Sequence, residues 1–223
     1  MPAYNEAAVI KDVIKHAIKV FEDSPHDISI VVINDKSTDS TAEKASKAIV
    51  INHIINMGAG GATATGLRYA EENNFDIAVT MDADGQHAPQ DVLKGVNYLI
   101  KSDLDLLIGS RLIDSQGMSR VKVLGNKGLS FITWVIFGIH STDSQSGLRV
   151  FSKNALDRLY WKTSGYEFAS EMLWRAHQQR LKTNEFSIRA IYTDYSMSKG
   201  QSNWNAINII KSLVRRRIAE MFE

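Results

Sequence analysis

Two acidic residues in a short turn are the strongest candidates for chemistry in this sequence. Asp82 and Asp84 lie in the segment Asp82-Ala83-Asp84-Gly85-Gln86-His87, directly after an apolar run at residues 77–81. In open α/β sheets the ligand crevice lies beyond the carboxyl ends of the strands, so polar residues there carry functional weight. Two carboxylates this close repel each other unless a cation joins them. The turn therefore predicts a Mg²⁺ or Mn²⁺ site, because these ions bind one or two carboxylates together with water and phosphate oxygens.

Two neighbours of this turn have less certain roles. Gln86 offers an amide oxygen to the same cation, whereas His87 is interpreted as structural. For an isolated acidic pair the alternative is a turn in which Asp82 and Asp84 accept hydrogen bonds from backbone N–H groups. Other motifs in the sequence are needed to distinguish a metal site from such a turn.

The elements that would position this turn alternate between strands and helices. Apolar runs predict strands at 28–33, 48–51, 77–81 and 104–108, and helical spacing predicts helices at 5–21, from 58–61 to 72, and from Pro89 onward. Beyond residue 112 the pattern predicts helices at 126–137, 167–179 and 204–221, and strands at 148–151 and 188–192. Strands that alternate with helices predict an α/β fold with a mostly parallel sheet covered by helices on both faces.

Composition excludes several classes of protein. The 223 residues include 26 Lys and Arg against 25 Asp and Glu, a net charge of +1, which excludes a polycationic nucleic-acid arm and a disordered chain. The sequence has no cysteine, so disulfides, thiolate metal sites and a cysteine nucleophile are excluded. Without a basic and apolar leader at its start, the sequence predicts a cytoplasmic protein. The longest apolar run, 131–139, is about half of a membrane span and indicates core or an interfacial element.

Further motifs stand in order along the chain. They are Pro2-Ala3-Tyr4-Asn5-Glu6, Val32-Ile33-Asn34-Asp35-Lys36-Ser37-Thr38-Asp39, Asn56-Met57-Gly58-Ala59-Gly60-Gly61-Ala62, Met81-Asp82-Ala83-Asp84-Gly85-Gln86-His87 and Gly109-Ser110-Arg111. In this order they resemble glycosyltransferase family 2, and within it the branch of dolichol- and polyprenyl-phosphate sugar synthases. Asp143 with Ser146-Gly147-Leu148-Arg149, and Ser198-Lys199, extend the resemblance over essentially the whole chain.

The resemblance implies a GT-A (Rossmann-like) fold, a nucleotide-diphosphate sugar donor, a divalent metal and an inverting transfer to a polyprenyl or dolichyl phosphate. Pro2, Tyr4, Glu6, Asp35 and Asp82 would bind the nucleotide sugar, and Asp82, Asp84 and Gln86 the metal. Asp84, Arg111 and Asp143 would be catalytic, and Arg120, Arg149 and Lys199 would bind the acceptor phosphate. The single domain, 1–223, would have a nucleotide-sugar-binding half at 1–111 and an acceptor-binding half at 112–223. Two positions depart from the family pattern, since Asn34 and Lys36 stand where many relatives carry Asp and Gly.

The identity of the acceptor depends on which residues reach it. A metal held by Asp82 and Asp84 would stabilise the charge that develops on the departing diphosphate. A lipid phosphate is already anionic and needs only positioning, whereas a saccharide hydroxyl needs a carboxylate base, for which Asp143 and Glu171 are the candidates. Cations such as Arg111 favour the phosphate acceptor, although structural ion pairing is an alternative role for each of them.

The predicted last helix, 204–221, combines an apolar stripe with Lys211, Arg215, Arg216 and Arg217. This composition suits peripheral contact with the cytoplasmic face of an anionic membrane. The alternative is a helix packed on the domain with a solvated basic flank.

Three other functions share part of the pattern. A dinucleotide-dependent oxidoreductase would use the glycines at 58–61, but Thr63 stands where the fingerprint has its third glycine. A sugar nucleotidyltransferase would release pyrophosphate, and no Gly-rich, basic phosphate loop is found near the start. A catalytically silent nucleotide-binding domain would bind nucleotide without transfer.

Overall fold

The computed structural model describes residues 1–115, 118–193, 195, 211 and 213–214. Lys199 and most of the predicted helix at 204–221 lie outside the described residues. The strands are β1 (Pro2–Ala3), β2 (Val31–Asn34), β3 (Ile49–Asn52), β4 (Ile77–Thr80), β5 (Leu106–Ser110), β6 (Arg149–Ser152) and β7 (Thr183–Ser187). The helices are α1 (Ile10–Phe21), α2 (Thr41–Lys44), α3 (Gly58–Glu72), α4 (Pro89–Lys101), α5 (Arg120–Phe137), α6 (Lys153–Arg158) and α7 (Phe168–Gln178).

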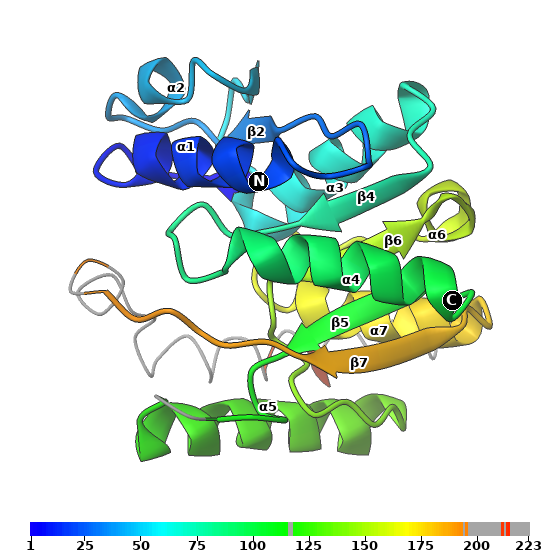
Figure 1. Ribbon diagram of the computed structural model, residues 1–223. Helices are drawn as coiled ribbons and strands as arrows, with labels where there is room; N and C mark the ends of the chain where they lie inside the picture. Colours follow the sequence, from blue (N-terminus) through cyan, green and yellow to red (C-terminus); the bar gives the residue numbers. More distant parts are fainter. Residues whose placement is uncertain (116–117, 194, 196–210, 212, 215–223) are drawn as a thin grey trace.

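The strands form two neighbouring sheets. One is parallel, in the order β1-β2-β3, and the other has four strands in the order β4-β6-β5-β7. Within the second sheet β5 and β7 are parallel, whereas β6 runs antiparallel to both β4 and β5. Helix α4 lies on the near side of this sheet and α7 behind it (Figure 1). The predicted α/β fold with mostly parallel strands and helices on both faces is confirmed, and β6 is the antiparallel exception.

The four-stranded sheet is apolar on both faces, as its sequence requires. Leu106 and Ile108 of β5 pack in one buried cluster with Met172 of α7. Leu107, between them, packs in another cluster with Val92 of α4. Because side chains alternate between the two faces of a strand, an unbroken apolar run supplies both layers.

Three elements differ from the predictions. The strand expected at 188–192 is β7, which lies earlier at Thr183–Ser187 and pairs with β5 at the edge of the sheet. Helix α5 begins at Arg120 rather than near 126, because Ser119 caps it by accepting a hydrogen bond from the Lys122 amide (3.4 Å). The short helix α6 was not predicted.

Two features of the whole chain complete the fold. A cavity of about 750 Å³ lies between β2 and β4 and is lined mainly by apolar side chains of these strands, α1, α3 and α4. None of the helices in the part of the chain described here has the length and apolar character needed to cross a membrane.

Candidate active site

A cavity of about 670 Å³ opens beyond the carboxyl ends of β1, β2, β4 and β5. It gathers most of the predicted site residues from distant parts of the chain. Those that line it are Pro2, Tyr4, Glu6, Asp35, Asp82, Asp84, Gln86, Arg111 and Arg149. Asp143 and Arg120 are not among its lining residues.

The acidic turn lies on one wall of this cavity. The Asp82 side chain is 43% exposed, and its Oδ2 lies 3.1 Å from Nε2 of the buried His87. Loss of surrounding water pushes the pKa of Asp82 upward. The hydrogen bond and charge of His87, together with other nearby positive charges such as that of Arg111, outweigh this effect, so the pKa of Asp82 lies below its ordinary value. Burial and the nearby charge of Asp82 raise the pKa of Asp84. His87 is therefore a positioning residue for Asp82, consistent with the structural role predicted for it.

This donor set fits a hard divalent cation. The Asp84 carboxylate is contacted by the Gln86 amide groups, with Oδ1 2.9 Å from the backbone N and Oδ2 2.5 Å from Nε2. Burial and the nearby charge of Asp82 both raise the pKa of Asp84, so a cation placed between the two carboxylates would relieve an unfavourable charge. Among the described residues no cluster of three or more acidic or histidine side chains completes a metal site. A cation held by Asp82 and Asp84 would therefore take its other ligands from phosphate and water, as Mg²⁺ and Mn²⁺ do.

Gly147 makes room for Asp82. A Cβ atom added at Gly147 would lie 2.6 Å from Cγ of Asp82 and would overlap both of its oxygens. The Gly147 carbonyl in turn accepts a hydrogen bond from Thr80 Oγ1 (2.8 Å), just before the acidic turn. The segment that precedes β6 therefore fixes the position of Asp82.

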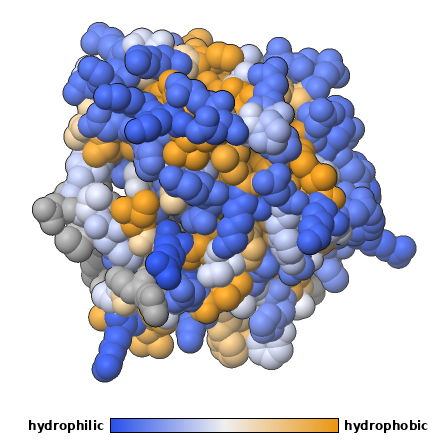
Figure 2. Space-filling view, in the orientation of Figure 1, coloured by the Kyte–Doolittle hydropathy of each residue, from blue (hydrophilic) through white to orange (hydrophobic). Residues whose placement is uncertain are grey.

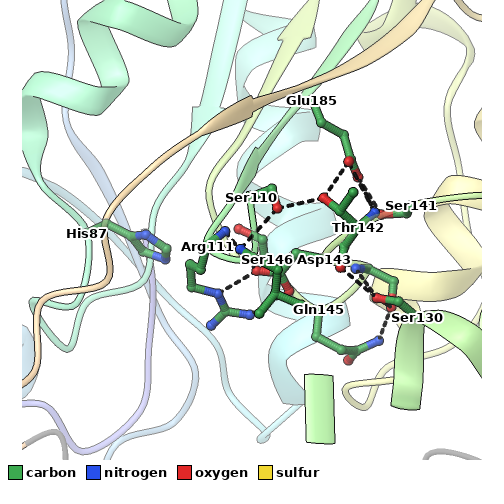
Figure 3. A network of polar contacts seen from close by, with 12 residues as sticks. His87, Ser110, Arg111, Ser130, Ser141, Thr142, Asp143, Gln145, Ser146 and Glu185 are labelled. Carbon is green, nitrogen blue, oxygen red and sulfur yellow. Dashed lines mark hydrogen bonds and ion pairs between the residues drawn. The ribbon is translucent and has the colours of Figure 1, made fainter. Parts of the chain in front are cut away.

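Arg111, at the end of β5, is held by a buried partner. Its Nε and Nη2 donate to the two oxygens of Asp143 at 2.7 and 2.8 Å, and its backbone amide donates to Oδ2 at 3.1 Å. Asp143 is 0% exposed, and Figure 3 shows it beside Arg111 within a wider network that includes Thr142 and Glu185. Asp143 is thus a positioning residue for Arg111, and the alternative in which it deprotonates a hydroxyl acceptor does not fit its location.

Arg149 is buried in the wall of the cavity, and its predicted contact with acceptor phosphate stays a prediction. It is 1% exposed, and its guanidinium donates to the backbone carbonyls of Ser144, Ser146 and Ala169 at 2.8–3.1 Å. Burial lowers its pKa to about 10. Arg149 therefore supports the segment that carries Asp143 and Gly147.

Asp35 also has partners within the protein. Its carboxylate accepts hydrogen bonds from the backbone amides of Met57 (2.7 Å) and Gly58 (2.8 Å), and His53 Nδ1 lies 2.8 Å from Oδ1. Asp35 thus binds the first amides of α3, where a negative charge is favourable. In the structure Asp35 therefore stabilises the start of α3, and its predicted contact with the nucleoside stays a prediction.

Some cavity residues were not singled out from the sequence. Lys122 of α5 lines the cavity, and its Nζ lies 4.1 Å from the centre of the Tyr192 ring, which also lines it. The segment that carries Tyr192 is joined to the acidic turn, because Ile191 N donates to Gln86 O (2.9 Å). Lys122 was missed because the start of its helix was predicted too late.

The arrangement of strands and cavity has counterparts among solved structures. A glucosyl-3-phosphoglycerate synthase from Mycobacterium tuberculosis, solved with phosphoglyceric acid, matches with a TM-score of 0.70 at 22% identity over 95% of this chain and 77% of its own. A mannosyl-3-phosphoglycerate synthase from Rubrobacter xylanophilus matches with a TM-score of 0.69 at 17% identity over 99% and 71%. The fold is therefore GT-A.

Sequence relationships define the family. The sequence model described as Glycosyl transferase family 2 matches residues 1–160. An uncharacterized protein of Methanocaldococcus jannaschii is 40% identical over 98% of this chain and 90% of its own length. A UDP-N-acetylglucosamine–dolichyl-phosphate N-acetylglucosaminyltransferase of Methanococcus voltae is 37% identical over 100% and 96%. The chain belongs to glycosyltransferase family 2 and is a glycosyltransferase.

Proposed function

We propose that this enzyme transfers a sugar from a nucleotide-diphosphate sugar to a polyprenyl or dolichyl phosphate, with inversion and with the help of Mg²⁺ or Mn²⁺. The observation that carries the proposal is the placement of the acidic pair Asp82 and Asp84 and the cation Arg111 around one cavity. The names of two relatives point to the same class of acceptor. One is the Methanococcus voltae enzyme, and the other is an undecaprenyl-phosphate mannosyltransferase of Micrococcus luteus, 25% identical over 89% of this chain and 85% of its own.

On the donor side, Asp82 and Asp84 would hold the cation, which when bound stabilises the negative charge of a departing diphosphate. The residues around them support this role. His87 orients Asp82 through Nε2, and Gly147 leaves the space that its carboxylate occupies. A related solved structure, a glucosyl-3-phosphoglycerate synthase, contains Mn²⁺ and UDP-glucose at 20% identity and a TM-score of 0.66.

On the acceptor side, the partners of the carboxylates favour a phosphate over a hydroxyl. A hydroxyl acceptor needs a carboxylate base within hydrogen-bond reach. In the described part of the chain, Glu6 accepts from the Tyr195 hydroxyl (2.8 Å) and Asp35 binds backbone amides, while Asp82 and Asp84 form the metal candidate. Arg111 and Lys122 instead supply positive charge to the cavity. An acceptor phosphate is already ionised, and its direct attack opposite the leaving diphosphate inverts the sugar.

A donor and acceptor panel tests this function. Purified enzyme would be incubated with dolichyl phosphate and either UDP-N-acetylglucosamine, UDP-glucose or GDP-mannose, with Mn²⁺ or with EDTA. We expect metal-dependent formation of a lipid-linked sugar and release of nucleoside diphosphate. Pyrophosphate as product would identify a nucleotidyltransferase instead. Transfer to a free saccharide but not to dolichyl phosphate would show that the acceptor is a saccharide hydroxyl and not a lipid phosphate.

The Asp84→Asn substitution tests the metal site separately from turnover. We expect transfer to fall by about a hundredfold to a thousandfold, as when a key electrostatic group is removed. Because a cation relieves the repulsion between the two carboxylates, Mn²⁺ should raise the melting temperature of the wild type but not of Asp84→Asn. The matched control, Asp23→Asn at an exposed site after α1, should keep both properties. An equal shift of melting temperature in all three proteins would rule out this metal site.

A further inference from the structure

Helix α5 has an apolar face whose side chains are exposed in the described part of the chain. Leu124, Phe131 and Val135 are 75%, 59% and 62% exposed, and Val121 and Trp134 are also exposed. At the spacing of an α-helix these residues share one side of α5. Leu129 and Phe137 on the opposite side are buried against the domain. Helix α5 lies apart from the two sheets at one end of the molecule, and apolar surface is visible at this end (Figures 1 and 2).

This apolar face continues into the acceptor side of the cavity. Val121 belongs to both surfaces, since it is exposed and also lines the cavity together with Lys122, Gly125 and Leu129 of the same helix. No side chain would obstruct the passage at Gly125, where an added Cβ would meet nothing within 4 Å. An apolar chain attached to a phosphate in the cavity could therefore leave along α5.

The charge of α5 matches an anionic surface. Its sequence, RVKVLGNKGLSFITWVIF, contains Arg120, Lys122 and Lys127 and no acidic residue. Exposed apolar and aromatic side chains with cations beside them are the composition of helices that lie in the membrane–water interface. Arg120 and Lys127 are exposed, so they can reach lipid phosphates while the apolar side chains enter the acyl region.

We infer that the outer face of α5, formed by Val121, Leu124, Phe131, Trp134 and Val135, docks the enzyme on an anionic lipid bilayer. The inference rests on the proposed function, because the polyprenyl acceptor is itself a membrane lipid. It assigns the contact to α5, whereas the sequence had suggested only the helix at 204–221. Docking in this way turns the acceptor side of the cavity toward the lipid surface.

Vesicle binding tests the surface directly. The variant Leu124→Gln/Phe131→Gln/Val135→Gln changes residues that do not line the cavity, and Ile54→Gln/Ile55→Gln removes equally exposed apolar side chains elsewhere. Wild type and control should co-sediment with phosphatidylcholine vesicles that contain phosphatidylglycerol. The α5 variant should partition at least about tenfold less, since burial of one such side chain is worth about that factor. Equal sedimentation of all three proteins would overturn the inference.

Trp134 reports where α5 lies. Lipids brominated in their acyl chains should quench part of the wild-type tryptophan fluorescence, and the Trp134→Phe variant should lose that quenched part. Light scattering measures the oligomeric state and so tests whether a second copy of the chain, instead of a bilayer, covers the apolar face of α5. A dimer that dissociates in the α5 variant would overturn the inference, whereas a monomer in both proteins supports it.

Activity assays separate this inference from the proposed function. With a short, water-soluble polyprenyl phosphate the α5 variant should turn over like the wild type, and with a long-chain acceptor in vesicles it should be about tenfold slower. Equal rates of wild type and variant on both acceptors would overturn the role of α5. If the wild type turns over neither acceptor, the proposed function fails, while sedimentation and quenching still decide whether α5 binds the bilayer.

Discussion

Charged residues around the cavity divide between two tasks. Asp82 and Arg111 face the cavity at 43% and 15% side-chain exposure. Asp143 and Arg149 are both buried, but only Arg149 is among the residues that line the cavity. A buried charge is strongly unfavourable unless hydrogen bonds and opposite charges surround it. The two buried residues meet this condition through contacts with Arg111 and with backbone carbonyls. We therefore expect Asp143 to act on the reaction indirectly, through Arg111.

The Asp143→Asn substitution tests that indirect role. Removing one charge of the pair should lower the free energy of unfolding by about 3 kcal/mol. Transfer should fall by about tenfold to a hundredfold, the range seen when an orienting partner is lost. The transfer rate of the variant should depend on pH at the acidic end in the same way as that of the wild type. This is the result expected if Asp143 exchanges no proton with the acceptor.

An exposed ion pair provides the control for this experiment. Asp157→Asn removes the pair with Lys153 on the surface and should change stability by less than about 1 kcal/mol without affecting transfer. If the wild-type transfer rate falls at low pH and that of Asp143→Asn does not, Asp143 is the base that deprotonates the acceptor.

The Gly147→Ala substitution tests the packing against Asp82. The added methyl group overlaps the Asp82 carboxylate, so we expect this carboxylate to move and transfer to fall by at least about tenfold. At Gly128 in α5 a Cβ meets nothing within 4 Å, so Gly128→Ala should keep full transfer. Comparison of the transfer rates and Mn²⁺ affinities of the two variants checks this prediction. Normal Mn²⁺ affinity in Gly147→Ala would contradict it.

Sequence reasoning found the residues that face the cavity better than those that support them. Asp82 and Arg111 follow strands, and that local rule is visible in the sequence. The pairing of Arg111 with Asp143 joins residues 32 positions apart, and no local pattern specifies it. Arg149 was selected through the family resemblance, and its carbonyl partners become apparent only once the chain has folded.

At the scale of elements, the turn after β2 shows how a departure from the family pattern is accommodated. Lys36, where many relatives carry Gly, adopts a φ of 61°. Asn34 is fixed in the same turn, since its Nδ2 donates to Asn52 Oδ1 of β3 (2.7 Å) and its Oδ1 accepts from Ser37 N (3.2 Å). A left-handed conformation is unfavourable for Lys by roughly 1 kcal/mol. The turn therefore persists at some cost in stability.

The Lys36→Gly substitution should remove this strain. We expect the free energy of unfolding in urea to rise by up to about 1 kcal/mol, because glycine adopts positive φ freely. Lys47, another exposed lysine, is not among the described residues with positive φ. In Lys47→Gly the free energy of unfolding should therefore stay the same or decrease. A loss of stability in Lys36→Gly would mean that the lysine side chain contributes more than its backbone strain.

Most elements were predicted because apolar spacing identifies buried strands and amphipathic helices. Strand β7 was misplaced because its residues, TNEFS, are mostly polar. An edge strand needs only one paired neighbour and tolerates such residues, and here β5 supplies the pairing. The start of α5 was missed because its first turns carry exposed apolar residues, so helical periodicity alone did not separate a buried from an exposed face.

At the scale of the whole molecule, the segment 141–149 contacts residues from several distant parts of the chain. Ser141 and Thr142 bind Glu185 of β7, Asp143 clamps Arg111, and Gly147 packs against Asp82. The segment is also bonded to α5, since Ser130 Oγ donates to Thr142 O (3.3 Å) and accepts from Ser144 N (3.0 Å). In a chimera between relatives, exchange of 120–137 without 141–149 would break these contacts. For anyone redesigning specificity, the two segments should be exchanged as one unit.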